Sequence, residues 1–525
     1  MTTEKETRAG LRTRPAFAVG AGIFLSRIVG FVRDAAIAAF FGTGLTADAY
    51  TAALRIPNIL RNLLGEGTLS ASFIPVYSGL LARGAEREGR RLAGTILGIL
   101  LALAALLSAL GILLAPWLTR IIVPGWSPDA VGLTARLVRI LFPMAGFMIL
   151  AAWSLGILNS HRRFFLPFAA PILWNLSQIA GLLIAWRIGW EPLVVALAWS
   201  TLIGGALQFF VQLPAALKMA GRIRLSLDVK WEAASRVLRN LGPVVLGAGA
   251  YQISSLLDVF LASFLVHGAV ATLYFSQRLY FLPVSLFGIS VAASALPELS
   301  RDAELENRDA LKLRLRNGFR SICFTVIPSA FAFILFGDWI VSLLFERGTF
   351  GEESRVLVHA TLAAYAVGLL AAASAKLFAS GYHAMLDTRT PVKFAVVGLS
   401  LGAATGAALM WPLYAAGLAL GGAVAAWTNV ILLWAGLDRR LGAVFEAQDL
   451  AYILKIVGAC VVGAVAGLAV EWLASSGSGP GGPLWQKLWV TTGTLGAFGV
   501  VYLATSAMIR TLPMGGLRAW TGRAS

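Results

Sequence analysis

The sequence predicts an all-α polytopic membrane protein with about fourteen transmembrane helices, in two six-helix parallel-repeat lobes followed by a C-terminal helix pair. Three observations predict this class. Hydrophobic residues make up 58% of the 525 residues and charged residues 13%, about half the charged share of a soluble domain. Apolar runs of about 20 residues, the length that crosses a bilayer, recur along the chain. The two halves of the chain also repeat one another.

The apolar runs are separated by polar, Gly or Pro residues, which set their limits. The predicted spans are 16–42, 48–82, 93–120, 132–158, 166–187, 191–217, 240–266, 270–298, 318–345, 356–382, 392–412, 415–437, 450–474 and 485–509. Pro57 and the GEGT stretch interrupt the second run, and Pro283 with Gly288 interrupts the eighth. Interrupted helices of this kind line the sites of transporters.

The connections alternate in charge. Segments such as ARGAEREGRR, KMAGRIRLSLDVKWEAASRVLRN and RDAELENRDALKLRLRNGFR are basic, whereas GTGLTAD and VPGWSPD contain few basic residues. This bias predicts an even number of spans with both termini cytoplasmic.

We interpret the net charge of +17 as contact with anionic membrane lipids, and we expect no nucleic-acid partner. Two basic connections, around 230–239 and 306–317, predict interfacial helices on the cytoplasmic face, with a solvated linker as the alternative.

The internal repeat divides the chain. Four pairs of matching residues are separated by 222 to 224 positions: Arg55 and Arg278, Pro75 and Pro297, Trp117 and Trp339, and Pro167 and Pro391. Six spans per half is an even number, so the halves have parallel orientation. The predicted parts are a cytoplasmic tail (1–15), an N-lobe (16–225), a C-lobe preceded by an interfacial helix (226–440), a terminal helix pair (441–510) and a second cytoplasmic tail (511–525).

Charged residues near the middle of the first two spans are the main functional signal. A charge at the bilayer centre costs about 2.5–3.5 kcal/mol on insertion scales, so these side chains should line a water-filled interior. Five arginines face three acids, which leaves a positive surplus that suits an anion: Arg27, Arg33, Arg55, Arg61 and Arg278 against Asp34, Asp48 and Glu66. Arg favours bidentate recognition of phosphate or carboxylate. Arg27 and Asp34 lie seven residues apart on one helix face, so mutual neutralisation of this pair is the alternative.

The chain lacks the sequence signatures of the common enzyme classes. It contains no G-x-S-x-G, no Walker A sequence and no H-E-x-x-H. Its two cysteines and four histidines have no metal-ligand spacing. We therefore expect a transporter without a cofactor, driven by a coupling ion (Na⁺ or H⁺) or by the membrane potential. The alternatives from other classes are a membrane-embedded polyprenyl-phosphate enzyme and a non-transporting scaffold.

Five segments carry a family resemblance: SRIVGFVRD, RIPNILRNLLGEGTLSASFIPV, GILNSHRRFFLPFAAPILWN, FERGTF and LDTRTPVK. They resemble the MurJ/MviN family of lipid II flippases, in the multidrug/oligosaccharidyl-lipid/polysaccharide exporter superfamily. The resemblance implies a multi-pass protein of the bacterial cytoplasmic (inner) membrane. It further implies that undecaprenyl-diphosphate-linked peptidoglycan precursor, lipid II, moves from the inner to the outer leaflet by alternating access. The terminal pair would form a lipid groove, and the cell-wall synthesis machinery is a possible partner. A related exporter of another lipid-linked oligosaccharide or of drugs is the alternative.

The resemblance also implies which residues bind. The family's central-cavity residues correspond to Arg27, Arg33, Asp34, Asp48, Arg61 and Arg278, with Asn175 as a polar cavity residue and Arg55 at a basic position of the same motif. A sodium site of the family implies Asp258 and Thr428 as ligands. The eleventh span, however, contains neither Asn nor Asp to complete that site.

Overall fold

The computed structural model describes residues 22, 24–475 and 480–512, and every regular element among them is helical. The predicted N-terminal tail and most of the predicted C-terminal tail lie outside these residues. The described residues form two compact units: unit 1 comprises those of 1–37 and 44–267, and unit 2 comprises 38–43 and those of 268–525.

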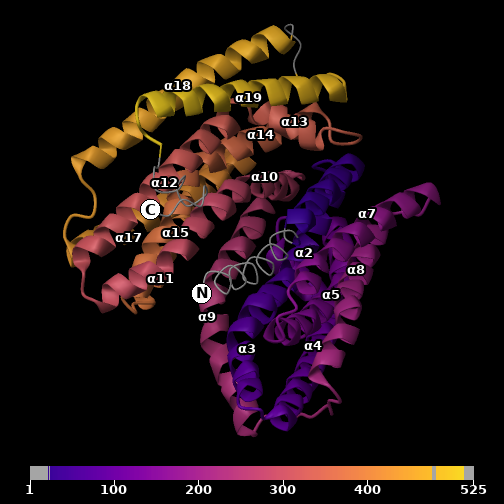
Figure 1. Cartoon of the computed structure of the whole chain (residues 1–525). Helices are drawn as coiled ribbons and strands as arrows, with labels where there is room; N and C mark the ends of the chain where they lie inside the picture. The colour runs from indigo at the N-terminus through magenta and orange to yellow at the C-terminus, as the bar shows by residue number, and fades with distance from the viewer. Residues whose placement is uncertain (1–21, 23, 476–479, 513–525) are drawn as a thin grey trace, which may run out of the picture. The chain divides into compact units, whose positions relative to one another are not determined.

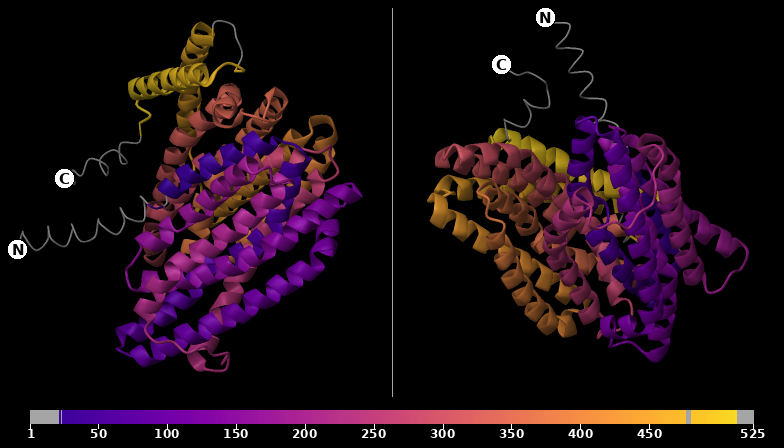
Figure 2. Two further views of the ribbon diagram at one scale, coloured as in Figure 1. Left: turned by 90° about the vertical axis from the view of Figure 1, so that its right-hand side faces the viewer. Right: turned by 90° about the horizontal axis from the view of Figure 1, so that it is seen from below.

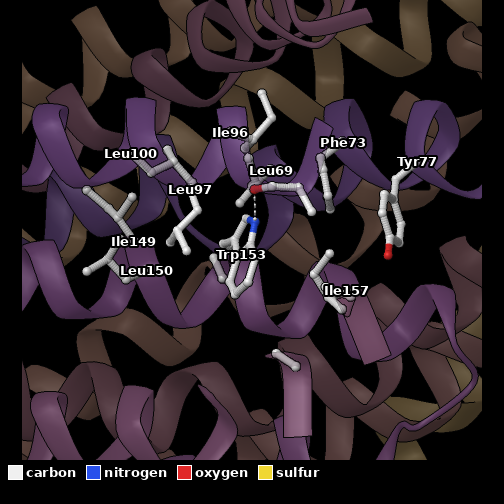
Figure 3. Packing of buried hydrophobic residues seen from close by; sticks show 14 of the residues in the cluster. Leu69, Phe73, Tyr77, Ile96, Leu97, Leu100, Ile149, Leu150, Trp153 and Ile157 are labelled. Atoms are coloured by element: carbon white, nitrogen blue, oxygen red, sulfur yellow. Dashed lines mark hydrogen bonds between the residues drawn. The ribbon is translucent and has the colours of Figure 1, made fainter. Parts of the chain in front are cut away.

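Unit 1 is built around one central helix, α5, which packs against α2, α3, α4 and α8. The unit contains residues 24–37 of a first helix (24–41), α2 (Leu45–Leu64), α3 (Glu66–Ala82), α4 (Glu86–Ile122), α5 (Pro128–Ser160), α6 (Phe165–Ala169), α7 (Pro171–Arg187), α8 (Leu193–Ala220) and α9 (Glu232–Ala262). Figure 3 shows part of its core, where Trp153 of α5 lies among apolar side chains of α3 and α4. The buried indole nitrogen of Trp153 donates to the Ala93 carbonyl (3.1 Å), so its polar atom is satisfied.

Unit 2 contains α10 (Ala269–Pro283), the π-helical turn η1 (Val284–Ile289), α11 (Ser290–Glu304), α12 (Arg308–Leu335), α13 (Gly337–Phe345), α14 (Glu352–Val367), α15 (Leu369–Ala384), α16 (Arg389–Leu413), α17 (Ala415–Leu441), α18 (Ala447–Ser475) and α19 (Leu484–Met508). The predicted interruption at Pro283 and Gly288 is the π-helical turn, since Pro283 has no N–H to continue the α-helical pattern. A Cβ on Gly288 would lie 2.8 Å from the Cα of Ala373, so glycine permits α15 to approach closely.

The number of membrane spans agrees with the prediction only in part. The described residues include ten helices long and apolar enough to cross a bilayer, or eleven if α14 and α15, bent by 42°, form one span. They coincide with the third to sixth and the eighth to fourteenth predicted runs. Of the remaining runs, 16–42 begins outside the described residues, and 48–82 is divided at Gly65 into α2 and α3. Run 240–266 lies in α9, where several side chains between 243 and 254 are outside the described set. The count of fourteen stays a prediction.

The structure places α9 and the two basic connections differently from the prediction. The segments predicted as separate interfacial helices are the first turns of α9 and α12, which continue without a break. Because α9 packs against α2, α3 and α4, it belongs to unit 1 and not to the C-terminal half. The compact units therefore divide at His267, whereas the predicted lobes divide at 225.

Ion pairs at both ends attach the terminal pair, α18 and α19, to the rest of unit 2. The two helices lie side by side in yellow tones (Figures 1 and 2). At the start of α18, the buried carboxylate of Asp449 accepts from Arg320 (2.7 Å) and pairs with Arg316 (3.4 Å), both on α12. At the start of α19, Lys487 binds Glu346 (2.8 Å), which follows α13.

Glu346 belongs to a wider charge cluster. Its second oxygen lies 3.5 Å from Nε of Arg355 on α14, and Arg355 also pairs with Asp338 of α13. The side chains of Arg355 and Lys487 are only 6% and 8% exposed. Buried charges are tolerated only when they are paired, so the cluster fixes α13, α14 and α19 to one another.

Asp387, in the connection between α15 and α16, holds the start of α16. Its carboxylate accepts from the Thr390 hydroxyl (2.6 Å), from the Thr390 and Arg389 amides (3.0 Å each) and from Arg440 (2.7 Å). The hydrogen bonds from Thr390, followed by the interaction with Arg440, hold the pKa of Asp387 well below its usual range.

We expect Asp387→Asn to lower the free energy of unfolding of the purified protein at pH 7 by about 0.5–2 kcal/mol, as for other helix caps. Because the folded-state pKa is lowered, the stabilisation is present above the ordinary Asp pKa of about 4 and is lost as the pH falls towards the folded-state value. Thermal unfolding should therefore differ between the two proteins at pH 7 and converge in acid. Asp309→Asn, at a side chain that is 96% exposed, is the control. A gap that persists unchanged in acid would contradict this account.

Candidate functional site

The buried polar groups of unit 1 meet where residues 24–41, α2 and α7 approach one another. Arg33 and Asp34 are neighbours in the first helix, and each is 3% exposed. Nη2 and Nε of Arg33 donate to Oδ1 of Asp34 at 2.6 and 3.1 Å. Asp34 thus binds Arg33, its neighbour in the sequence. A pair of this kind is neutral as a unit, which lowers the cost of burying both charges.

Asn175 of α7 connects this pair to a second helix. Nη1 of Arg33 donates to Oδ1 of Asn175 (2.8 Å), and Nδ2 of Asn175 donates to the Ser26 carbonyl (3.3 Å). The amide therefore contacts the first helix at two points, two turns apart. The predicted grouping of Arg33, Asp34 and Asn175 is present in the structure.

Trp174, next to Asn175, brings in α2. The guanidinium carbon of Arg33 lies 5.0 Å from the centroid of the Trp174 ring, and that of Arg61 lies 5.9 Å from it. Both distances are within the range of cation–π attraction. Two of the predicted arginines, from different helices, therefore share one aromatic side chain.

A second polar layer lies one turn further along α7. Gln178 donates to the Trp174 carbonyl (3.1 Å) and accepts from the buried hydroxyl of Tyr50 (3.0 Å), which also lies 2.8 Å from the hydroxyl of Thr201. Asp48 is buried in the first turn of α2, where the helix dipole favours a negative charge.

A polar seam joins α2 to α9. Nη1 of Arg55 donates to the hydroxyl of Ser255 (2.8 Å), and Asn62 donates to Gln252 (3.3 Å). Asp258 lies one turn beyond Ser255 on α9 and is half-buried. Arg55 thus contacts α9, a helix that the sequence assigned to the other half.

The other charged or polar residues singled out from the sequence are exposed, outside the described side chains, or in unit 2. Arg27 is on the exposed part of the first helix, and the side chain of Glu66 is outside the described ones. Arg278 lies in unit 2, on α10, where it donates to the hydroxyl of Tyr274 (2.9 Å) and lies over its ring (4.7 Å). Thr428 is half-buried on α17, also in unit 2. The described residues hold no group of three or more His, Cys, Asp or Glu that could bind a metal, and the sodium ligands Asp258 and Thr428 stay predictions.

Hydration and anion binding in this interior stay predictions. In this conformation Arg33 is buried and bound by Asp34 and Asn175. Asp34 holds Nε and Nη2 of Arg33, so an anion that binds these two atoms has to replace the carboxylate. Arg61 is half-buried and lies against the ring of Trp174. Trp174, Gln178, Tyr50, Gln252 and Ser255 were not predicted; the one available signal was the occurrence of Asn175 and Gln178 in an otherwise apolar run.

Gly65, between α2 and α3, sets the position of Arg61. A Cβ at this residue would lie 2.1 Å from the Arg61 carbonyl oxygen, closer than any real contact. We expect Gly65→Ala to push the end of α2 away and to reduce function by about tenfold or more, since displacements of about 1 Å can cost a hundredfold. Growth rescue at equal membrane levels is the measurement. Gly67→Ala is the matched control, because a Cβ there meets nothing within 4 Å. Equal rescue by both variants would contradict the prediction.

Comparison with known proteins places this geometry in a family. Residues 37–482 match the family model described as "Lipid II flippase MurJ". The chain is 33% identical over 504 residues to a probable lipid II flippase MurJ of Rhizobium meliloti (strain 1021), covering 93% of this chain and 92% of that protein. It is 32% identical over 472 residues to the lipid II flippase MurJ of Burkholderia cenocepacia, covering 88% and 90%.

Solved structures agree on the fold. A lipid II flippase MurJ in an inward closed conformation superposes with a TM-score of 0.75 at 24% identity, covering 94% of this chain and 98% of that one. An inward-facing multidrug resistance transporter of the MATE family and MOP superfamily gives a TM-score of 0.65 at 15% identity, covering 80% and 95%. At these identities the likeness shows the fold alone, that of a polytopic helical transporter.

Proposed function

The chain belongs to the lipid II flippase MurJ family, and from that premise we propose that it moves lipid II across the bacterial cytoplasmic membrane. The cargo is an undecaprenyl diphosphate carrying a disaccharide-pentapeptide, and it passes from the inner to the outer leaflet by alternating access. The observation that carries the proposal is the pair of guanidinium groups, Arg33 and Arg61, gathered on Trp174 inside the helices of unit 1. A related exporter of another lipid-linked oligosaccharide or of drugs gains no support from the relatives.

The chemistry of the cargo fits this pair. A diphosphate presents several anionic oxygens, and Arg binds such oxygens in a bidentate manner. Arg61 meets the diphosphate first, and the diphosphate then replaces the Asp34 carboxylate on Arg33. Such an exchange substitutes one anion for another, so the buried guanidinium is never left without a counter-charge. Asp48, Asn175 and Arg55 complete the polar surroundings in unit 1, and Arg27 and Arg278 are further candidate substrate-binding residues by the resemblance.

The polyprenyl tail stays in lipid along α18 and α19. Several large apolar side chains of this pair are exposed in the structure, including Val465, Leu468, Trp472, Trp485 and Trp489. Tryptophan residues near the helix ends are typical of membrane–water interfaces. The ion pairs at Asp449 and Glu346 keep this surface fixed to unit 2.

The remaining features of the proposal concern location and energy. The charge bias of the connections supports cytoplasmic termini and contact with anionic lipids of the inner membrane, and we include the cell-wall synthesis machinery as a partner that uses the product. The driving force is the membrane potential, worth about 2.3 kcal/mol per elementary charge per 100 mV, or an ion gradient of Na⁺ or H⁺. Asp258 and Thr428 are our candidates for a sodium site.

The test is lipid II accessibility after rapid loss of the protein. We expect lipid II to remain on the inner leaflet, out of reach of an external probe or hydrolase, until the intact chain is supplied again. Unchanged exposure of lipid II on the outer leaflet of cells that have no other flippase would contradict the proposal.

A further inference from the structure

Trp174 occupies an unusual place in the candidate site. It lies on α7, while the two guanidinium groups on its ring come from the first helix and from α2, at 5.0 and 5.9 Å from the ring centroid. Its backbone is fixed: Gln178 donates to its carbonyl, and a Cβ on Gly204 of α8 would lie 2.9 Å from that carbonyl oxygen. The ring is therefore held on a well-packed helix and faces two cations.

Hydrogen bonding does not set the orientation of the ring. The indole nitrogen Nε1 is buried and has no hydrogen-bond partner among the described residues. A buried indole N–H usually has one. The contacts of the ring with Arg33 and Arg61 are thus the polar interactions that the structure gives this side chain.

An aromatic ring can hold two cations without neutralising them, which a carboxylate cannot do. Arg33 and Arg61 carry like charges, and their repulsion is offset by Asp34 only while that carboxylate stays on Arg33. The π-face attracts both guanidinium groups through its quadrupole but carries no charge, so it holds them without cancelling them. Asp34 already offsets the charge of Arg33, and a second carboxylate in the place of the ring would neutralise Arg61 as well before an anion arrived.

We propose that Trp174 is a positioning residue of the anion site, whose ring face holds Arg33 and Arg61 at one place so that both can bind the same diphosphate. This inference rests on the proposed function. It predicts that Trp174 affects diphosphate binding only through its contacts with Arg33 and Arg61. These contacts need the face of an aromatic ring at this position.

The experiment measures binding of undecaprenyl diphosphate to the purified full-length protein in nanodiscs. We expect Trp174→Leu to weaken binding about tenfold, which corresponds to the 1.4 kcal/mol within the range of a desolvated cation–π pair. Trp174→Phe keeps a ring face and should bind within about threefold of the unsubstituted protein. Trp186→Leu, at an exposed tryptophan of the same helix, is the matched control and should bind normally.

A double-mutant cycle separates positioning from mere stability. Arg61→Ala should weaken binding more than Trp174→Leu. In the Arg61→Ala background Trp174→Leu should cost clearly less than it does alone, because of the two arginines only Arg33 then remains on the ring and contacting residues are not additive. The inference would be overturned if Arg61→Ala and Trp174→Leu weakened binding independently, so that their fold-losses multiplied in the double variant. It would also be overturned if Trp174→Phe lost as much binding as Trp174→Leu. If Trp174→Leu does not reach the membrane, Trp174→Met takes its place with the same expectation.

The two proposals fail in different ways. No binding by the unsubstituted protein, or normal binding by Arg61→Ala, overturns the proposed site and this inference with it. A clear loss in Arg61→Ala together with normal binding by Trp174→Leu overturns the role of Trp174 alone.

Discussion

Replacement of Arg61 by Ala should reduce lipid II transport about 10- to 150-fold, because a hydrogen bond to a charged group contributes about 1.5–3 kcal/mol. In cells that depend on this chain, such a loss should prevent growth. The measurement is growth rescue, followed by lipid II accessibility, at membrane levels matched to the unsubstituted protein. Arg61→Lys keeps the charge but loses the planar fork, so it should rescue only in part.

Arg187→Ala is the matched control for this prediction, since Arg187 is exposed at the end of α7. It should rescue fully. Arg33→Ala would be a less specific test, because it removes the partner of the buried Asp34 carboxylate and would destabilise unit 1 as well. Full rescue by Arg61→Ala would show that this guanidinium has no part in transport.

Replacement of Lys487 by Met should destabilise unit 2 by about 3–5 kcal/mol, the range found when one partner of a buried ion pair is removed. The change leaves Glu346 without the ammonium that lies 2.8 Å from its carboxylate. The attachment of α19 to α13 should loosen, so the expected result is a lower unfolding temperature and faster proteolysis between α18 and α19.

A second substitution tests the cause. Adding Glu346→Gln to Lys487→Met removes a buried carboxylate that would keep, among the described residues, only Arg355, at 3.5 Å, as a cationic neighbour, and should restore part of the lost stability. Lys455→Met, at an exposed residue of α18, is the control and should unfold like the unsubstituted protein. The opposite outcome is that adding Glu346→Gln lowers the free energy of unfolding further, by as much as the loss of another ion pair. In that case the pairing of Glu346 with Lys487 would not explain the effect of Lys487→Met.

Most of the fold could be predicted from local sequence. Apolar length alone located the eleven runs that coincide with candidate spans, and Pro283 marked the π-helical turn. The connections around 230–239 and 306–317 were harder, because the same basic, amphipathic pattern suits an interfacial helix and the first turns of a long span. Packing decides between them, and α9 and α12 continue into the apolar runs.

The site was predictable where charges stand in the first two spans, and only in part elsewhere. Arg33, Asp34 and Arg61 are conspicuous because charges in apolar runs are costly. Their partners come from far along the chain: Asn175 is 142 residues from Arg33, and Ser255 is 200 residues from Arg55. Trp174 resembles any apolar residue of α7 until the packing of α7 against the first helix and α2 is known.

The burial of Arg33 bears on how a diphosphate could bind in the proposed site. Arg33 is paired with Asp34, which offsets its buried charge in this conformation. In the proposed mechanism Asp34 therefore competes with the diphosphate for the Arg33 guanidinium.

The most direct test of the central claim is a structure of this protein bound to undecaprenyl diphosphate. We predict phosphate oxygens within about 3 Å of the Arg61 guanidinium, the distance of a charge-assisted hydrogen bond, with Asp34 displaced from Arg33. A diphosphate bound elsewhere, with Arg33 still on Asp34 and Arg61 still on Trp174, would contradict the account.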